Sequence, residues 1–174
     1  MSDLRYPIGP FKVPGRFDAD IREASIAQIE AAPANLRQTV ADLTESQLDT
    51  PYRPDGWTVR QVVHHLPDSH INAYIRFKLA LTEDHPTIKT YEEKAWSEQK
   101  DAREAPIESS LALLSSLHER WVLMLRGLPE AAWSRSLTNP DMGDMTVDVL
   151  LAIYSWHGQH HVAHITRLRE RNGW

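Results

Sequence analysis

The chain has 174 residues, a formal net charge of −5, a pI near 6.0 and no cysteine. This length suits one domain over residues 1–174, large enough to bury a core without disulfide bonds. The lack of cysteine excludes thiolate metal sites and a cysteine nucleophile, and the acidic balance argues against a nucleic-acid partner. No apolar run approaches the ~20 residues of a membrane span, and the N-terminal residues show no signal peptide. A cytoplasmic protein without a membrane partner is therefore expected.

The first segment, residues 2–17, is rich in proline and glycine and predicts an extended arm laid over the body of the protein. Helical spacing of apolar residues begins near Asp18 and continues to Leu43. Pro33 lies inside this run, so the pattern predicts either one kinked helix or two collinear pieces.

A proline-rich loop over residues 48–56 precedes the second predicted helix. Thr58 is its predicted N-cap, and apolar residues recur at helical spacing from Val59 to Leu81. Pro67 lies inside this helix and predicts a bend just after His65.

Apolar stripes predict two further helices, at about Ile107–Arg126 and Thr146–Arg171. Two long polar segments, Thr82–Pro106 and Leu128–Asp144, read as irregular loops, with a short helix expected at Glu92–Trp96. The predicted fold is all-α: a four-helix bundle with an extended N-terminal arm and long irregular loops.

The candidate functional residues are concentrated in the last predicted helix, where four of the nine histidines lie between residues 157 and 164. His157 and His161 are four residues apart and share a helix face, but so do His160 and His164. Spacing alone does not choose between these pairs. Imidazoles that face a bundle interior need a partner, and a divalent metal ion provides one.

Two imidazoles are a weak ligand set, so a third ligand is expected from the second helix, which carries His64, His65 and His70. Asp68 lies four residues after His64 and is a candidate hydrogen-bond partner for it. Other metal motifs fail: no Glu-x-x-His pair of a di-iron bundle occurs, and His118 lacks the second histidine of a zincin helix.

Six segments, in order along almost the whole chain, resemble the YfiT-like branch of the DinB superfamily. They are Tyr6–Gly9, Leu48–Arg53, Gly56–Leu66, Tyr74–Lys78, Glu93–Trp96 and Trp156–Ile165. This family is described as metal-dependent hydrolases, and related members look like bacillithiol-dependent S-transferases. The resemblance implies a bundle that binds one divalent metal ion through His65, His157 and His161. Zinc is expected first, with nickel, iron and manganese as alternatives, and a cytosolic homodimer is implied.

Three functional hypotheses follow. In the first, an ion on three histidines keeps an open position and supports either hydrolysis or transfer of a low-molecular-weight thiol on a small-molecule substrate. Asp68 or Glu93 would then assist proton transfer. The second is a non-catalytic metal-binding or small-molecule-binding stress protein, with a closed coordination sphere. The third is a purely structural bundle with buried histidines.

Overall fold

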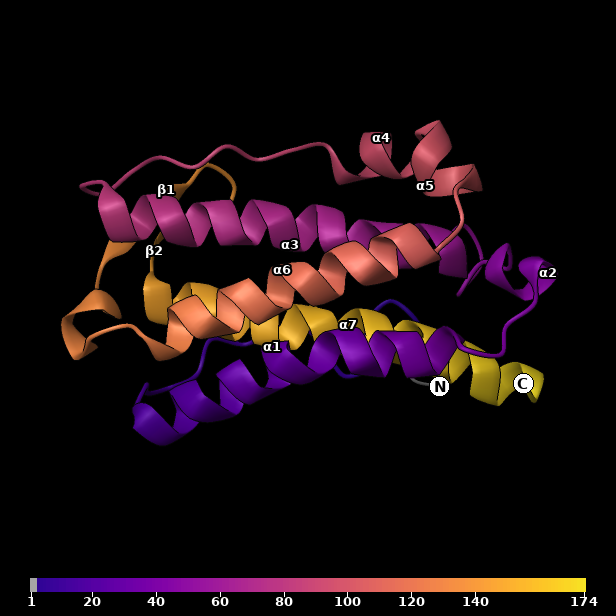
Figure 1. The fold of residues 1–174 in the computed structure, drawn as a ribbon, viewed down its shortest axis with the longest axis horizontal. Helices are drawn as coiled ribbons and strands as arrows, with labels where there is room; N and C mark the ends of the chain where they lie inside the picture. Colours follow the sequence, from indigo (N-terminus) through magenta and orange to yellow (C-terminus); the bar gives the residue numbers. More distant parts are fainter. Residues whose placement is uncertain (1–2) are drawn as a thin grey trace.

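The computed structural model describes residues 3–174, and four long helices form a bundle (Figure 1). They are α1 (Ala19–Val40), α3 (Val59–Thr82), α6 (Glu108–Arg126) and α7 (Val147–Asn172). α1 packs on α6 and α7, and α3 packs on the same two helices, so α1 and α3 occupy opposite corners of the bundle. The predicted four-helix bundle is confirmed. In residues 3–174, no helix is both long and apolar enough to cross a membrane.

Short elements lie in the connections between the long helices. They are α2 (Glu45–Leu48), α4 (Glu93–Ser97), α5 (Lys100–Glu104), the 3₁₀ turn η1 (Glu130–Ala132), β1 (Ser136–Asn139) and β2 (Gly143–Thr146). The segment expected to be one irregular loop with one short helix thus holds two, α4 and α5, which lie against α3 (Figure 1). The second expected loop contains an antiparallel hairpin, with Ser136 opposite Thr146 and Asn139 opposite Gly143. Neither strand was predicted, because four-residue strands are too short to show a clear alternation.

The ends of the helices follow local sequence rules. Thr58 caps α3 as predicted: its side chain accepts from the backbone N–H of Gln61, whose side chain accepts in turn from the backbone of Thr58. α7 ends at Gly173, which adopts the left-handed conformation with φ 69°. α1 runs unbroken through Pro33, so it is one helix, and α3 likewise continues through Pro67.

The N-terminal arm lies along α7, as the sequence predicted. Residues 9–17 contain no helix or strand. The indole N–H of Trp156 donates to the carbonyl of Gly9 at 3.3 Å, and Phe11 packs edge-on against the same indole. Further along α7, His164 donates from Nε2 to the carbonyl of Arg5 at 3.1 Å. The arm therefore covers the face of α7 that carries Trp156 and His164.

The core consists of two apolar clusters at opposite ends of the bundle. One contains Phe77, Trp121 and Leu150, and the other contains Leu36, Leu66, Leu114 and Ile165. Buried histidines occupy the layer between these clusters on three of the four helices. They are His65 and His70 on α3, His118 on α6 and His161 on α7, and the half-buried His157 of α7 joins them. A polar layer buried between two apolar clusters needs internal hydrogen-bond partners or a bound ion.

Candidate metal centre

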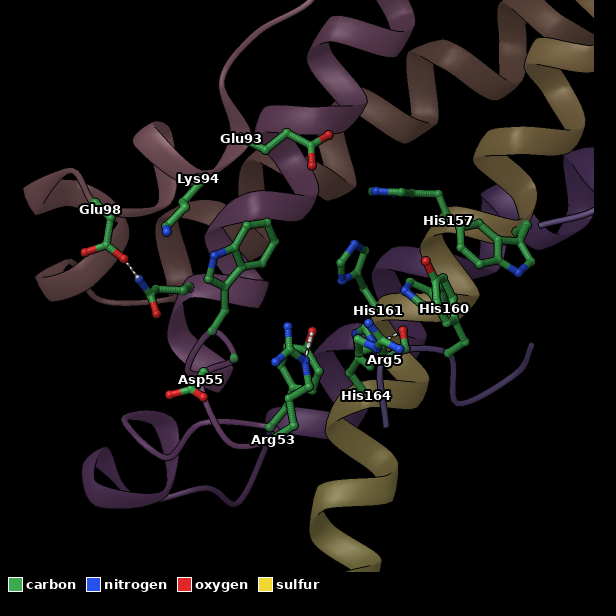
Figure 2. Close-up of a pocket in the computed structure, with 16 residues that line it drawn as sticks. Arg5, Arg53, Asp55, Glu93, Lys94, Glu98, His157, His160, His161 and His164 are labelled. Carbon is green, nitrogen blue, oxygen red and sulfur yellow. Dashed lines mark hydrogen bonds between the residues drawn. The ribbon is translucent and has the colours of Figure 1, made fainter. Parts of the chain in front are cut away.

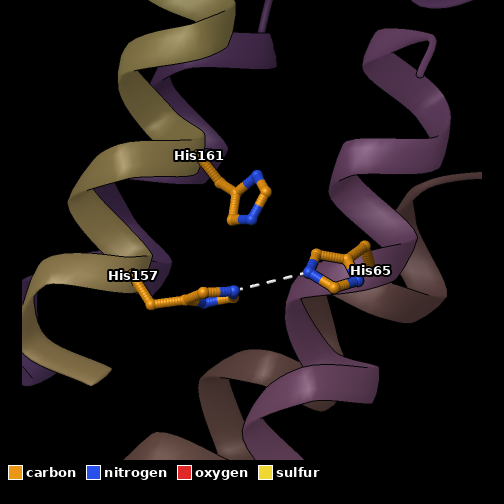
Figure 3. A group of neighbouring side chains, drawn as sticks. All are labelled: His65, His157 and His161. Carbon is orange, nitrogen blue, oxygen red and sulfur yellow. Dashed lines mark hydrogen bonds between the residues drawn. The ribbon is translucent and has the colours of Figure 1, made fainter. Parts of the chain in front are cut away.

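Three histidines predicted from the family resemblance come together across the interface of α3 and α7. His65, His157 and His161 each offer a ring nitrogen, and these three atoms lie within 4.8 Å of one another. Nε2 of His65 and Nε2 of His157 are 3.4 Å apart, and His161 points its ring toward both (Figure 3). In residues 3–174, this is the one group of histidine and carboxylate side chains close enough to hold an ion.

Helix geometry explains the convergence. His157 and His161 are one turn apart on α7, so their rings meet edge to face with centroids 4.5 Å apart. His65 enters from α3 with its ring centroid 4.8 Å from that of His161. The indole of Trp57 packs over His65 at 4.6 Å and restricts its orientation. Two rigid helices thus hold three imidazoles in one place.

Burial keeps these imidazoles neutral. Desolvation, with a smaller contribution from the charge of nearby His160, lowers the pKa of His65 to about 4. Burial also holds the pKa values of His157 and His161 well below the usual range, with mutual repulsion among the histidines adding to the effect. Metal ions bind neutral imidazole, so at pH 7 the three rings are in the form that binds a metal.

The cluster opens onto a cavity of about 630 Å³ lined by sixteen residues, of which ten are labelled in Figure 2. His157 and His161 form part of its wall, and Trp57 and Trp156 supply aromatic surfaces. Arg5, Arg53 and Lys94 add basic side chains, and Asp55, Glu93 and Glu98 add acidic ones (Figure 2). A cavity of this size accommodates a small organic molecule next to the imidazoles.

The two carboxylates expected to assist proton transfer lie in different cavities. Glu93, in the first turn of α4, lines the histidine cavity (Figure 2). It keeps contact with solvent, yet the surrounding walls partly desolvate its carboxylate and raise its pKa, against the opposing charge of Arg76. Asp68 instead lines a neighbouring cavity together with Asp101 and Trp96. Burial, reinforced by Asp101, raises the pKa of Asp68 to about 6. Of these two carboxylates, only that of Glu93 shares a cavity with the candidate metal ligands.

His64 lies outside the cluster, and its expected pairing with Asp68 was wrong. Its Nδ1 lies 2.7 Å from the hydroxyl of Ser110, and its Nε2 donates to the carbonyl of Ala105 at 3.1 Å. Both ring nitrogens are therefore occupied where α3 packs against the first turn of α6 and the end of α5.

His160 and His164 face the N-terminal arm and the wall of the cavity. His160 stacks on Trp156 at 4.3 Å, and His164 stacks on Tyr52 at 4.0 Å. Neither belongs to the group that could hold an ion. Of the two histidine pairs that spacing left open, the pair that meets His65 is His157 and His161.

His70, whose role the sequence left open, connects the cluster to the core. Its Nε2 lies 3.1 Å from Nδ1 of His157, and its Nδ1 lies 2.7 Å from Nε2 of His118. His118 was not predicted as part of this site, because in the sequence it stands out only as half of a zincin motif. Its spacing from Leu114 and Trp121 on the buried stripe of α6 was the signal, because a histidine on that stripe must find a partner inside the protein.

Comparison with known proteins agrees with this fold and site. Residues 28–165 match the DinB superfamily, and the chain belongs to that superfamily. It is 51% identical over 173 residues to YfiT of Bacillus subtilis (strain 168), covering 99% of this chain and 97% of YfiT. It is 50% identical over 174 residues to a protein of Bacillus mycoides (strain KBAB4), covering all of both chains. Both relatives carry names that class them provisionally as metal-dependent hydrolases.

A solved structure extends the comparison to three dimensions. YfiT from Bacillus subtilis superposes with a TM-score of 0.96 and covers 98% of each chain, and its description reports an unusual four-helix bundle topology. The family resemblance found in the sequence is therefore confirmed.

Proposed function

We propose that this chain is a metal-dependent hydrolase whose divalent ion is held by His65, His157 and His161. The observation that carries the proposal is the convergence of three neutral ring nitrogens, from two buried histidines and one half-buried histidine, within 4.8 Å at the wall of a cavity. Three protein ligands with room for a further ligand are typical of catalytic sites, whereas structural zinc sites have four protein ligands. In the described part of the chain, no fourth histidine or carboxylate joins the group.

The donor set fits such an ion. Two nitrogens bound to zinc at ~2.1 Å and at a tetrahedral angle lie roughly 3.4 Å apart. Nε2 of His65 and Nε2 of His157 have this separation, 3.4 Å. Three neutral imidazoles suit zinc, nickel or iron, whereas manganese prefers carboxylate ligands, so we propose zinc first.

A bound divalent ion supplies a Lewis acid that lowers the pKa of a water molecule and so provides a nucleophile at neutral pH. The protein supplies the proton acceptor, and we assign this role to Glu93 rather than Asp68. Glu93 lines the same cavity as His157 and His161, and its raised pKa makes the carboxylate a stronger base than an ordinary glutamate. Trp57 and Trp156 also line the cavity and would hold the apolar part of a substrate.

Thiol transfer is the second candidate for the same site. Arg5, Arg53 and Lys94 line the cavity, and these basic side chains suit a small thiol that carries carboxylates, such as bacillithiol. A thiol that binds the ion would lose its proton and could then attack an electrophile.

The test is a comparison of the zinc-loaded protein on a panel of esters and amides with the same protein on bacillithiol plus an electrophile. Hydrolysis that disappears in the His157→Ala variant and persists in a His85→Ala variant would support the proposal, because His85 lies on the surface away from the cavity. Activity only with the thiol would favour the second candidate. Zinc-independent activity, or none with either set, would contradict both.

A further inference from the structure

A continuous chain of hydrogen bonds leads from the backbone of α1 to the candidate metal centre. The carbonyl of Ile29 accepts from Nδ1 of His118 at 2.6 Å. Nε2 of His118 lies 2.7 Å from Nδ1 of His70, and Nε2 of His70 lies 3.1 Å from Nδ1 of His157. The far nitrogen of His157, Nε2, is the one that faces His65. The links from Ile29 to His118 and from His118 to His70 are buried, and the link from His70 to His157 is partly buried.

The first link fixes the direction of all the others. A carbonyl oxygen can only accept, so Nδ1 of His118 must carry a proton. A neutral imidazole carries one proton, so Nε2 of His118 has a lone pair and must accept from Nδ1–H of His70. By the same reasoning, Nε2 of His70 accepts from Nδ1–H of His157. The chain therefore ends with an unprotonated Nε2 on His157 that faces His65.

Neutral rings are required for this argument, and the surroundings supply the reason. His70 is fully buried and His118 is 2% exposed. The rings of His70, Trp121 and Tyr154 contact one another edge-on, and none of these neighbours carries a negative charge that would stabilise an imidazolium. A charged imidazole in this layer would therefore be strongly disfavoured.

We propose that His118 and His70 are positioning residues that hold the proton of His157 on Nδ1 and thereby keep its Nε2 free to bind the ion. Histidine ligands commonly donate their other ring N–H to a carboxylate or a carbonyl, which fixes the tautomer and the orientation of the ring. Here two further imidazoles, on α3 and α6, connect the ligand to a backbone carbonyl of α1. The part of this proposal that concerns the ion rests on the proposed function, whereas the proton positions do not.

The direct test is the proton position in the metal-free protein. Long-range ¹H–¹⁵N correlation spectra of protein labelled at histidine distinguish a protonated ring nitrogen from an unprotonated one. We expect His118, His70 and His157 to carry their protons on Nδ1 at pH 8. A proton on Nε2 of His70 or of His157 would overturn the proposal, whether or not the protein binds a metal.

Three variants then test the effect on the ion. His118→Phe keeps an aromatic ring but leaves His70 without an acceptor, and we expect zinc affinity to fall 10–100-fold. His118→Gln offers an amide oxygen near the position of Nε2 and should restore most of the affinity. The control is His64→Phe, which removes another buried histidine. His64 lies on α3, and its hydrogen bonds to Ser110 and Ala105 are not part of the series that leads to His157.

Affinity is measured by competition with a zinc chelator, and the spectra of His157 are recorded for each folded variant. Wild-type affinity and an unchanged proton position in folded His118→Phe would overturn the proposal, as would equal losses in His118→Phe and His64→Phe. If His118→Phe does not fold, the proton positions of the wild type and of His118→Gln decide the matter. If the wild type binds no zinc, the proposed function fails. The proton positions still decide whether the hydrogen bonds run in the proposed direction from His157 to Ile29.

Discussion

Acidification should destabilise the metal-free protein well above the pH at which ordinary carboxylates titrate. Burial lowers the pKa of His65, His118, His160 and His164 from 6.5 to about 4. As pH falls below 6.5, the unfolded chain takes up protons at these side chains before the folded protein does. The free energy of unfolding is therefore highest above pH 6.5 and decreases as pH falls toward 4.

The magnitude follows from the two pKa values. Between pH 7.5 and pH 5, one histidine with a pKa of 6.5 unfolded and about 4 folded reduces stability by about 2 kcal/mol. The four histidines with these values together give about 8 kcal/mol. Asp68 acts in the opposite direction, since its pKa is raised to about 6, and it restores only about 1 kcal/mol over this range. The loss is comparable with the whole stability of a small domain, ~5–15 kcal/mol, so the metal-free protein should be largely unfolded near pH 5.

Urea denaturation at pH 7.5, 6.5, 6.0 and 5.5 in the presence of a chelator measures this dependence. His118→Phe should lower the pH dependence by about 1.3 kcal/mol between pH 7.5 and pH 5.5, because one of the titrating groups is gone. Val122→Ala, in the same buried stretch of α6, should lower stability equally at every pH, since it removes no titrating group. A free energy of unfolding that stays constant from pH 7.5 to 5.5 would refute the reasoning.

Three further predictions concern single residues. Arg22→Ala should lower the free energy of unfolding in urea by about 3 kcal/mol. Arg22 binds the largely buried carboxylate of Asp148 at 2.7 and 2.9 Å, and the variant leaves that charge unpaired. A loss under about 1 kcal/mol would show that water replaces the arginine. Thr58→Ala removes the capping box of α3 and should cost about 1 kcal/mol in the same assay, whereas Thr58→Ser should cost little. Glu93→Gln should lower kcat by about 10²–10⁴-fold while bound zinc per chain stays unchanged. Loss of zinc from that variant would mean that Glu93 acts as a ligand instead of a base.

The sequence predicted the long helices because their apolar stripes and caps are local. Thr58, the predicted N-cap, is confirmed and acts through contacts within three residues, and Gly173 likewise ends α7 through local backbone geometry. The hairpin of β1 and β2 escaped prediction because its register depends on pairing rather than on a local pattern. In α1, tertiary packing outweighs a local signal. Pro33 removes one backbone hydrogen bond, but packing against α6 and α7 keeps the helix continuous.

The candidate ligands were predictable only with the family resemblance. Helical spacing put His157 with His161 and equally His160 with His164, and only the position of α3 beside α7 brings His65 to the first pair. The connection from Ile29 through His118 and His70 to His157 joins residues of four helices, so no spacing along the chain could reveal it. The homodimer stays a prediction.

The most direct test of the central claim is the metal content of untagged protein, measured by elemental analysis after reconstitution with zinc and removal of the excess. It is compared with that of a triple variant in which His65, His157 and His161 are replaced by alanine. The proposed site predicts about one equivalent of zinc in the wild type and none in the triple variant. Equal zinc content in the two proteins, or none in the wild type, would contradict the assignment of these three histidines as metal ligands.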